Sequence, residues 1–330
     1  MTTEPSFGAV DAAIDAVVIG RNEGARLQAC LASLCGQVRR LVYVDSGSTD
    51  GSPDLARRLG AEVVALDLSV PFTAARARNA GLAALADDPP VFVQMVDGDC
   101  EVDRGWIAAA RAAFADHPAA VVVCGRRRER FPGASVYNGL ADREWDTPVG
   151  SVRACGGDAL MRYVSVQAVG GYRADLIAGE EPELCLRLRA ASAESGAGEI
   201  WRIAAEMTRH DAALLRVGQW WRRTVRAGHA FAEGAALHGA GPDRHWVAET
   251  RRAVIWGFGL PLMILAGGLV TPWALLLALV YPAQVARLAR RDGWVWACFS
   301  VLGKFAEACG AIGYRLGRWR GRGRGLIEYR

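Results

Sequence analysis

Short apolar runs alternate with helical patterns along the first two thirds of the chain. Four of these runs are rich in β-branched residues and read as buried strands, over 16–19, 41–44, 63–66 and 91–96. Helical spacing of apolar or small residues fills the gaps, as in the segment 73–86. Strands and helices that alternate at these lengths predict a doubly wound α/β domain. Further strands are expected over 120–124 and 200–203.

The chain becomes mostly apolar after residue 252. Two apolar runs cover 253–270 and 273–286, each near or below the roughly 20 residues needed to cross a bilayer. Basic residues flank the pair on both sides: Arg251, Arg252, Arg287, Arg290 and Arg291. This pattern predicts a membrane hairpin with both ends on the cytoplasmic side. The alternative is a buried hairpin of a soluble domain.

The last segments also indicate a membrane surface. Residues 294–316 carry Lys304 and Glu307 within an apolar run, which favours an interfacial helix or one packed on the hairpin. The tail over 318–324 alternates Arg with Gly and is expected to bind anionic lipid head groups. We therefore expect an α/β domain over 1–235, a linker or interfacial segment over 236–252, and membrane-associated helices with a basic tail over 253–330.

Composition narrows the class of protein. The 330 residues are 52% hydrophobic, and the net charge of +4 is too small to indicate a nucleic-acid partner. None of the eight cysteines forms Cys-x-x-Cys, and most lie in apolar runs, which favours buried thiols in a reducing compartment. The first 15 residues lack a basic region and do not resemble a secretory signal peptide.

Two carboxylates follow the apolar run 91–96 directly, as Asp97-Gly98-Asp99. The carboxyl end of a parallel strand opens into the crevice where ligands bind in α/β sheets. Paired carboxylates in such a crevice, with no basic residue in the run, predict a site for Mg²⁺ or Mn²⁺. The alternative is an ordinary Asp-Gly turn.

Polar groups also follow the first two strands. Asn22 and Glu23 come after the first, and Asp45 and Ser46 after the second. They could hydrogen-bond a base and a ribose, or they could be turn and cap residues. A nicotinamide-dependent enzyme is disfavoured because the loop 20–24 lacks the Gly-x-Gly-x-x-Gly pattern.

We expect some arginines of the α/β domain to point into the crevice and others to point into solvent. Arg76 and Arg78 cannot share one helix face, and we expect Arg78, accompanied by Asn79 and Gly81, to point into the crevice. The dense basic run 126–130 is typical of a solvated face.

Four motifs in order resemble the family 2 glycosyltransferases, which have the A-type glycosyltransferase fold. They are Val17-Val18-Ile19 with Asn22-Glu23, Asp45-Ser46-Gly47-Ser48-Thr49-Asp50-Gly51, Arg78-Asn79-x-Gly81, and Asp97-Gly98-Asp99. The resemblance implies that the first loop and Asp45 hold the nucleotide base. It also implies that Asp97 lies near the ribose and that Asp99 binds the metal.

The segment 154–162 looks like the glycine loop of that family beside the donor sugar, with Gly156, Gly157 and Asp158. Gly179-Glu180-Glu181 resembles the motif that supplies the catalytic base. We expect Pro182 to be the first helical residue, which places Glu181 where the helix dipole keeps a carboxylate ionised. Glu181 is the first candidate for the base and Glu180 the second; alternatively these acids merely open a helix.

His210 lies where relatives of this family place a metal-binding histidine, although a lone histidine can be structural. Gln219-Trp220-Trp221-Arg222-Arg223 resembles the Gln-x-x-Arg-Trp motif of processive polysaccharide synthases, with Arg223 in place of the final Trp. Gln219 and Arg222 could clamp the diphosphate. The alternative is an amphipathic helix over 217–230 with its tryptophans at a membrane surface.

Together these features resemble an inverting, metal-dependent glycosyltransferase at the cytoplasmic face of a bacterial inner membrane. The resemblance implies a nucleotide-sugar donor, a UDP-sugar, and a lipid or polyprenyl-linked acceptor in the synthesis of a cell-surface polysaccharide or glycolipid. Two alternatives stay open, a processive polysaccharide synthase and a non-catalytic membrane scaffold that retains the fold.

Overall fold

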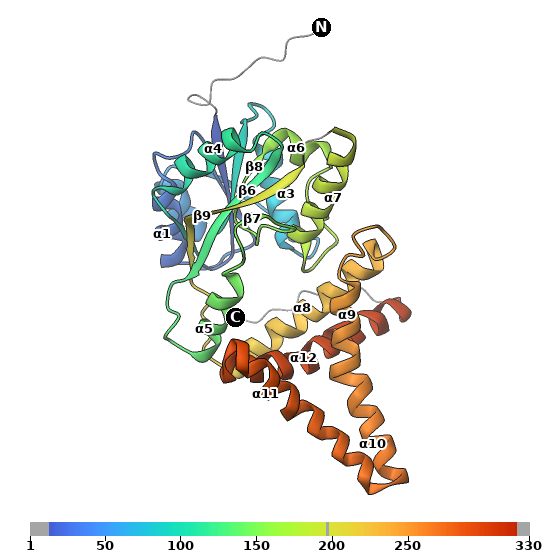
Figure 1. Ribbon diagram of the computed structural model, residues 1–330. Coiled ribbons are helices and arrows are strands. Elements are labelled where there is room, and N and C mark those ends of the chain that lie inside the picture. Colours follow the sequence, from blue (N-terminus) through green and yellow to red (C-terminus); the bar gives the residue numbers. More distant parts are fainter. Residues whose placement is uncertain (1–12, 196–197, 322–330) are drawn as a thin grey trace. The chain divides into compact units, whose positions relative to one another are not determined.

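The computed structural model describes residues 13–195 and 198–321. The predictions for the N-terminal 12 residues, and for the tail beyond residue 321, lie outside this range. The described residues up to 176 and from 180 to 213 form one compact unit, and residues 177–179 and 214–321 form another. Figure 1 shows the order of the elements along the chain.

Within the described residues, one mixed sheet of nine strands makes up the centre of the first unit. Its order is β3-β2-β1-β4-β8-β6-β9-β5, and β7 pairs with β9 outside this path. The strands are β1 (Ile14–Gly20), β2 (Leu41–Asp45), β3 (Glu62–Ala65), β4 (Phe92–Asp97), β5 (Cys100–Val102), β6 (Ala120–Glu129), β7 (Gly150–Ser151), β8 (Ala159–Arg162) and β9 (Glu199–His210).

The four strands that the apolar runs predicted are parallel neighbours. β1 pairs in parallel with β2 and β4, and β2 with β3, whereas β8 runs antiparallel to β4 and β6. In this register Ile19 is opposite Val44 on one side and Asp97 on the other. The carboxyl ends of β1, β2 and β4 therefore lie side by side, and so do the loops that follow them.

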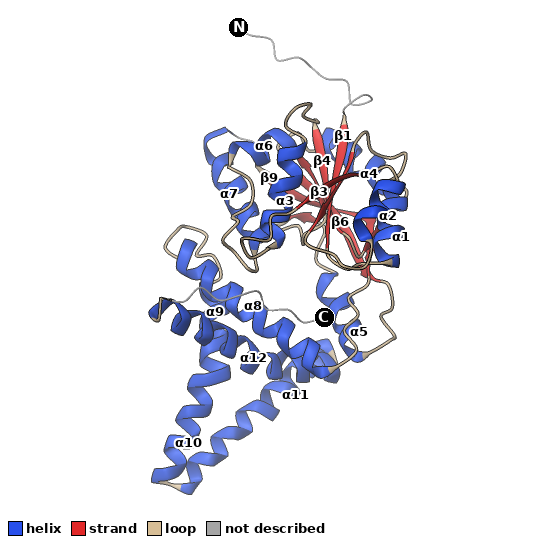
Figure 2. Cartoon of the chain, turned by 180° about the vertical axis from the view of Figure 1, so that it is seen from behind, coloured by secondary structure: helices blue, strands red, loops and turns tan. Residues whose placement is uncertain are grey.

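Helices flank the sheet of the first unit. They are α1 (Ala25–Leu34), α2 (Ser52–Arg58), α3 (Ala74–Ala84), α4 (Trp106–Asp116), α5 (Val136–Trp145), α6 (Tyr163–Ala168) and α7 (Glu180–Ser195). Figure 2 shows α3, α6 and α7 on one side of the strands and α1 and α2 on the other. The side chain of Thr73 caps α3 by accepting a hydrogen bond from the Arg76 N–H.

Three segments differ from the expectation. β6 continues to Glu129 and β9 to His210, because each strand pairs with the other over this length. α7 begins at Glu180, two residues before Pro182, and continues to Ser195, where we expected a loop from residue 192. Proline is tolerated there because its missing N–H lies in the first turn.

Helices alone make up the described part of the second unit. They are α8 (Val217–His238), α9 (Val247–Val254), the π-helical turn η1 (Ile255–Gly259), α10 (Leu260–Val270), the 3₁₀ segment η2 (Pro272–Leu279), α11 (Val280–Asp292) and α12 (Trp294–Trp319). Glycines let the backbones cross closely: a Cβ at Gly228 of α8 would collide with Glu307 of α12, and one at Gly257 with Lys304. α8 thus packs with the C-terminal helices, and the compact units divide after residue 213, whereas we expected the α/β domain to extend to residue 235.

Three helical stretches in the described residues are long and apolar enough to cross a membrane, namely Val247–Val270, Pro272–Asp292 and Trp294–Trp319. The first two correspond to the predicted hairpin, and their most apolar windows are only 11% and 0% buried within the protein. The third, which we predicted to be interfacial or packed on the hairpin, is 39% buried. Length and composition therefore support membrane association of this unit.

Candidate active site

The Asp97-Gly98-Asp99 turn lies at the carboxyl end of β4, the last of the four parallel neighbours, which borders the antiparallel strand β8. Two backbone contacts fix it: the Asp97 N–H donates to Oδ1 of Asp158 at 3.1 Å, and the Gly98 N–H donates to the carbonyl of Ile19 at 2.8 Å. A Cβ at Gly98 would lie 3.0 Å from that carbonyl oxygen, so a side chain here would push the turn away from β1. The glycine holds the two carboxylates next to the first loop.

Asp97 is bound by two arginines. Nη2 of Arg78 lies 2.7 Å from Oδ1 of Asp97, and Nη2 of Arg127 lies 3.2 Å from Oδ2. Burial raises the pKa of the Asp97 carboxyl, but the charges of Arg78 and Arg127 lower it by more, so the net pKa lies below its ordinary value. Both carboxylate oxygens thus already have a cationic partner.

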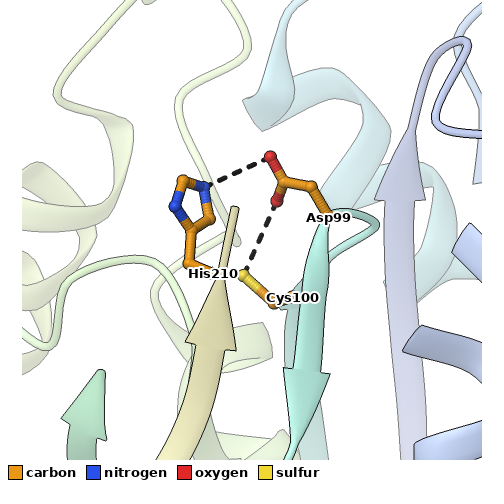
Figure 3. A group of neighbouring side chains, drawn as sticks. All are labelled: Asp99, Cys100 and His210. Carbon is orange, nitrogen blue, oxygen red and sulfur yellow. Dashed lines mark hydrogen bonds and ion pairs between the residues drawn. The ribbon is translucent and has the colours of Figure 1, made fainter. Parts of the chain in front are cut away.

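Asp99 faces His210 instead. Oδ2 of Asp99 lies 3.2 Å from Nε2 of His210, and the Cys100 thiol lies 3.6 Å from Oδ1 (Figure 3). β5 and β9 place these groups together, because Cys100 is directly opposite His210 in their antiparallel register. The ring of Trp145 packs edge-on against the imidazole, with centroids 4.8 Å apart.

This pair fits a divalent metal ion. A six-coordinate ion with ligands at about 2.1 Å places neighbouring ligand atoms about 3.0 Å apart, close to the observed 3.2 Å between Asp99 and His210. A carboxylate suits Mg²⁺ and Mn²⁺, and the imidazole nitrogen favours Mn²⁺ of the two. Burial, aided by the charge of Asp158, raises the pKa of the Cys100 thiol well above its usual value, so this thiol is a poor ligand for a hard cation.

Arg127 is a site residue that the sequence interpretation missed. Its Nη1 donates to the Gly156 carbonyl at 2.6 Å, its Nε lies 3.5 Å from Oδ2 of Asp158, and its guanidinium stacks 5.1 Å above the Trp145 ring. The basic run 126–130 is therefore only partly the solvated face that we expected. Arg126 and Arg128 do point away and pair with acids such as Asp146.

Strand periodicity places Arg127 in the site only once β6 is known to continue past residue 124. Along β6, alternate residues face the same side of the sheet, and Val123, Gly125, Arg127 and Glu129 form one such series. Had the strand been predicted to continue past residue 124, Arg127 would have been placed on an inward face.

The acids at the start of α7 take different partners. Oε1 of Glu180 lies 2.6 Å from Nη1 of Arg78, so that this arginine bridges Glu180 and Asp97. Oε1 of Glu181 accepts the Cys155 N–H at 2.6 Å and contacts the thiols of Cys155 and Cys185 at 3.0 Å each. Glu180 therefore has its charge balanced by a guanidinium, whereas Glu181, 5% exposed, receives only neutral donors among the described residues.

The two thiols next to Glu181 remain protonated at neutral pH. Burial raises the pKa of Cys185 well above its usual value. The contact with Cys185 lowers the pKa of Cys155, but burial and the charge of Glu181 raise it by more. All three contacts fall on Oε1 of Glu181, and no described residue hydrogen-bonds its Oε2. Oε2 is therefore the oxygen that could take up a proton.

The loops after β1 and β2 contact each other, as their adjacent strands require. Oδ1 of Asn22 accepts the Thr49 N–H at 2.7 Å, and Glu23 pairs with Arg26 at 2.8 Å. Asp45 is buried, and its carboxylate accepts the N–H groups of Gly47 and Ser48 and the Tyr43 hydroxyl, each at 3.0 Å. The Ser46 N–H donates to the Gly20 carbonyl at 3.0 Å. These four predicted residues shape the loops, as turn residues do.

The glycine loop, with Gly156 and Gly157, forms a second wall of the site, beside Asp97 and its two arginines. Gly156 and Gly157 have φ of 88° and 99°, conformations that favour glycine. A Cβ at Gly157 would lie 3.5 to 3.7 Å from Arg127, Arg78 and Asp97, so this residue forms part of the wall. Asp158 is fully buried and accepts the Thr208 hydroxyl at 2.8 Å as well as the Asp97 N–H, which makes it a support for the turn.

Gln219 and Arg222 belong to the second unit. The side chain of Gln219 caps its own helix, since Oε1 accepts the N–H groups of Leu215 and Arg216 at 2.9 and 3.0 Å. Arg222 is exposed on α8. Their role at a diphosphate stays a prediction.

Comparison with known proteins identifies the domain. Residues 15–145 match the family model described as glycosyl transferase family 2. The chain contains a family 2 glycosyltransferase domain. The matched segment includes the loops after β1 and β2, the Asp97-Gly98-Asp99 turn and Arg127.

Two curated relatives overlap this domain. The chain is 28% identical over 304 residues to the pre-mycofactocin glycosyltransferase of Mycobacterium tuberculosis, covering 87% of this chain and 60% of that protein. It is 32% identical over 135 residues to a TPR repeat-containing protein of Synechococcus elongatus, covering 41% of this chain and 32% of that protein. The chain thus spans from about a third to three fifths of these relatives.

Solved structures share the fold. The mannosyltransferase PcManGT from Pyrobaculum calidifontis, in complex with GDP-Man and Mn²⁺, superposes with a TM-score of 0.60 at 22% identity, over 91% of this chain and 87% of that chain. Residues 1–349 of TarS from S. aureus give a TM-score of 0.52 at 15% identity, over 94% and 92%. The predicted A-type glycosyltransferase fold is therefore confirmed.

Proposed function

We propose that this protein is a metal-dependent glycosyltransferase that moves a sugar from a nucleoside diphosphate sugar to an acceptor at a membrane. The observation that carries the proposal is the pairing of Asp99 with His210 at 3.2 Å, at the carboxyl end of β4. Its support is the family 2 domain and the fold shared with PcManGT, whose solved complex contains GDP-Man and Mn²⁺.

Asp99 and His210 would hold the metal ion, Mn²⁺ or Mg²⁺. Bound there, the ion neutralises the charge that develops on the diphosphate as it leaves. Asp97, which the resemblance places near the ribose and which is also a second candidate for the metal, has both oxygens engaged by Arg78 and Arg127. We therefore assign it to orientation of the turn and the ribose rather than to direct metal binding. Neutralised in this way, Asp97 does not repel the diphosphate.

Glu181 would act as the general base. In one displacement, the acceptor oxygen forms a bond to the anomeric carbon while the bond from that carbon to the diphosphate breaks, and Oε2 of Glu181 takes the hydroxyl proton. Attack opposite the leaving group inverts the configuration. Glu180 is the weaker candidate because Arg78 already binds it at 2.6 Å. A positioned base typically contributes about 10²- to 10⁴-fold to the rate.

Two donor classes, UDP-sugars and GDP-sugars, fit the proposal. The motifs resemble enzymes that use UDP-sugars, whereas PcManGT was solved with a GDP-sugar. Asn22, Glu23, Asp45 and Ser46 border the place that we assign to the base, and Asp45 has its oxygens occupied by turn contacts. The N–H groups from Ser46 to Thr49 also donate within the protein, so the backbone carbonyl groups of this loop are left to bind the base.

The acceptor is proposed to be a lipid or a polyprenyl-linked sugar, with the family 2 domain on the cytoplasmic side of a bacterial inner membrane. The support is the pair of nearly unburied apolar stretches, Val247–Val270 and Pro272–Asp292, with arginines at both outer ends. Arg223 in place of a tryptophan argues for a discrete product, since the stacking platform of processive synthases is missing.

A thermal-shift screen tests the proposal. The full chain in detergent is heated with UDP-, GDP- and dTDP-sugars, with and without Mn²⁺, since a ligand that binds the native state raises its apparent stability. We expect one nucleotide class to stabilise the wild type only when metal is present, and Asp99→Asn to lose this shift. Asp116→Asn, an exposed carboxylate at the end of α4, is the matched control and keeps it. If no nucleotide sugar stabilises the wild type, the enzymatic proposal fails and the scaffold alternative replaces it.

A further inference from the structure

The second unit contains a groove of about 500 Å³ between α8, α9, η1 and α12. Its walls are apolar and consist of alanines of α8 together with Val247, Val254 and Ile255. Arg251, Arg315 and Arg318 line it as well. A groove with apolar walls and a cluster of guanidinium groups is suited to a molecule that joins a hydrocarbon chain to an anion.

The groove lies at one end of two candidate membrane spans. Arg251 lies two residues before the apolar stretch 253–270, and Arg315 and Arg318 lie near the end of the apolar helix α12. Basic residues at the ends of apolar helices lie at the level of lipid phosphates. The three arginines are therefore at the depth where a lipid presents its phosphate, next to walls that continue into the apolar stretch.

Among the described residues, no acidic group balances the charge of the three arginines. In the part of the chain that the structure describes, none of them lies within 4.0 Å of a carboxylate oxygen, and the contact recorded for Arg318 is to the Tyr314 hydroxyl, at 3.3 Å. The neighbouring Arg252, in contrast, pairs with Glu249 at 2.9 Å. Guanidinium groups bind phosphate oxygens through paired N–H donors, which an anion in the groove would accept.

A second observation is independent of these charges. Thr250 lines the groove and is only 4% exposed, and its hydroxyl has no hydrogen-bond partner among the described residues. Buried hydroxyl groups are normally paired. A ligand oxygen reached by rotation of this side chain would satisfy it.

We propose that this groove binds the terminal phosphate of a membrane lipid, a phosphate monoester or diphosphate on a long hydrocarbon chain. Three guanidinium groups exceed what the single charge of a phosphodiester lipid requires, whereas a phosphate monoester carries about −1.5 to −2 at pH 7. A lipid-linked acceptor, or the lipid that carries it, would have such a phosphate on a hydrocarbon chain. Only the identification of the bound lipid with the acceptor rests on the proposed function. Binding itself does not depend on sugar transfer.

Native mass spectrometry of the detergent-purified full chain tests the proposal. Dioleoyl phosphatidic acid serves as the phosphate monoester probe and dioleoyl phosphatidylglycerol as the phosphodiester. We expect the wild type to retain phosphatidic acid in preference to phosphatidylglycerol by about tenfold, and the double variant Arg251→Gln/Arg315→Gln to lose about tenfold or more of that binding, since one charge-assisted hydrogen bond corresponds to about a factor of ten.

Two further variants separate a built site from general charge. Thr250→Val keeps the shape and the charge of the groove and should weaken binding of phosphatidic acid. Arg290→Gln removes an exposed arginine in the last turn of α11, outside the groove, and should change nothing. Equal retention of both lipids by the wild type, or equal losses in Arg290→Gln and the double variant, would overturn the proposal.

Two further measurements use the wild type alone and separate lipid binding from the proposed sugar transfer. Competition of inorganic phosphate with phosphatidic acid on the wild type needs no variant, and absence of competition counts against a phosphate site. Binding of a nucleotide sugar to the first unit is measured on the same samples. Its absence with phosphatidic acid still bound would reject the proposed function and leave the lipid site standing.

Discussion

Replacing Arg127 by methionine should destabilise the first unit more than the same replacement of Arg126, its neighbour in β6. The guanidinium is 12% exposed and lies 3.2 Å from Asp97, 3.5 Å from Asp158 and 2.6 Å from the Gly156 carbonyl. At an effective dielectric constant of about 20, a charge pair at this distance is worth roughly 5 kcal/mol before desolvation is subtracted. Removal of one partner of a buried pair typically costs about 3 to 5 kcal/mol.

We expect the lower end of this range, about 3 kcal/mol, because Asp97 keeps Arg78, and Asp158 keeps the Thr208 hydroxyl and a backbone N–H. Arg126→Met is the matched control. Its side chain is 31% exposed and pairs with the half-exposed Asp146 at 3.2 Å, an interaction worth at most about 1 kcal/mol.

Urea unfolding in a mild detergent, followed by pulse proteolysis, measures both variants. With a urea dependence of about 2 kcal/mol per molar, the midpoint of Arg127→Met should fall by about 1.5 M and that of Arg126→Met by less than about 0.5 M. Equal midpoints for the two variants would refute the assignment of Arg127 to the centre of the site.

The stability lost in Arg127→Met, relative to the wild type, should decrease at low pH. The pKa of Asp97 in the folded protein lies below its ordinary value because the two arginines outweigh burial. Stability from these pairs is therefore fully present above the unfolded carboxyl pKa of about 3.9, and it is lost as the pH falls through the lower folded value. The difference in free energy of unfolding between the wild type and Arg127→Met should become smaller below about pH 4 and stay constant from pH 5 to 7.

Three shorter predictions concern the site. Gly157→Ala forces alanine to φ of 99° beside three charged side chains and should weaken binding of the nucleotide sugar in a thermal-shift assay, whereas Gly133→Ala, with open space around its Cβ, should not. Glu181→Gln should lower the rate of sugar transfer by about 10²-fold or more with little change in donor binding. Glu180→Gln should instead weaken donor binding, because Glu180 holds Arg78. Equal losses of rate in the two variants would reject these roles. Removal of metal with a chelator should abolish transfer, and added Mn²⁺ should restore it; activity that persists without metal contradicts the role of Asp99 and His210.

Much of the fold and part of the site follow from local pattern. β4 was predicted because its apolar run is uninterrupted, and a buried strand that ends in Asp-Gly-Asp can place those acids only at the carboxyl edge of the sheet. The adjacency of the loops after β1 and β2 follows in the same way, since parallel neighbours end at the same edge. The positions of these strands and of the loops at their ends can be predicted because each strand has its own apolar pattern in the sequence.

The remainder depends on contacts between distant residues. The thiols that surround Glu181 come from Cys185, one turn later in α7, and from Cys155, 26 residues earlier, and no local signal joins them. Arg127 was assigned to solvent because a charged run usually is exposed, and only its pairing with β9 shows that β6 continues. Similarly, α8 packs with the C-terminal helices through glycines such as Gly228 and Gly310, a contact that hydropathy does not indicate.

In the proposed enzyme, Asp99 and His210 together hold the metal ion that the donor needs. Electron spin echo spectroscopy of Mn²⁺ added to the full chain with the stabilising nucleotide sugar tests it most directly, because it detects a nitrogen bound to the ion. We expect one bound Mn²⁺ with an imidazole nitrogen signal that disappears in His210→Gln, and loss of Mn²⁺ binding in Asp99→Asn but not in Asp116→Asn. Mn²⁺ bound without a nitrogen ligand, or bound equally by Asp99→Asn, would contradict it.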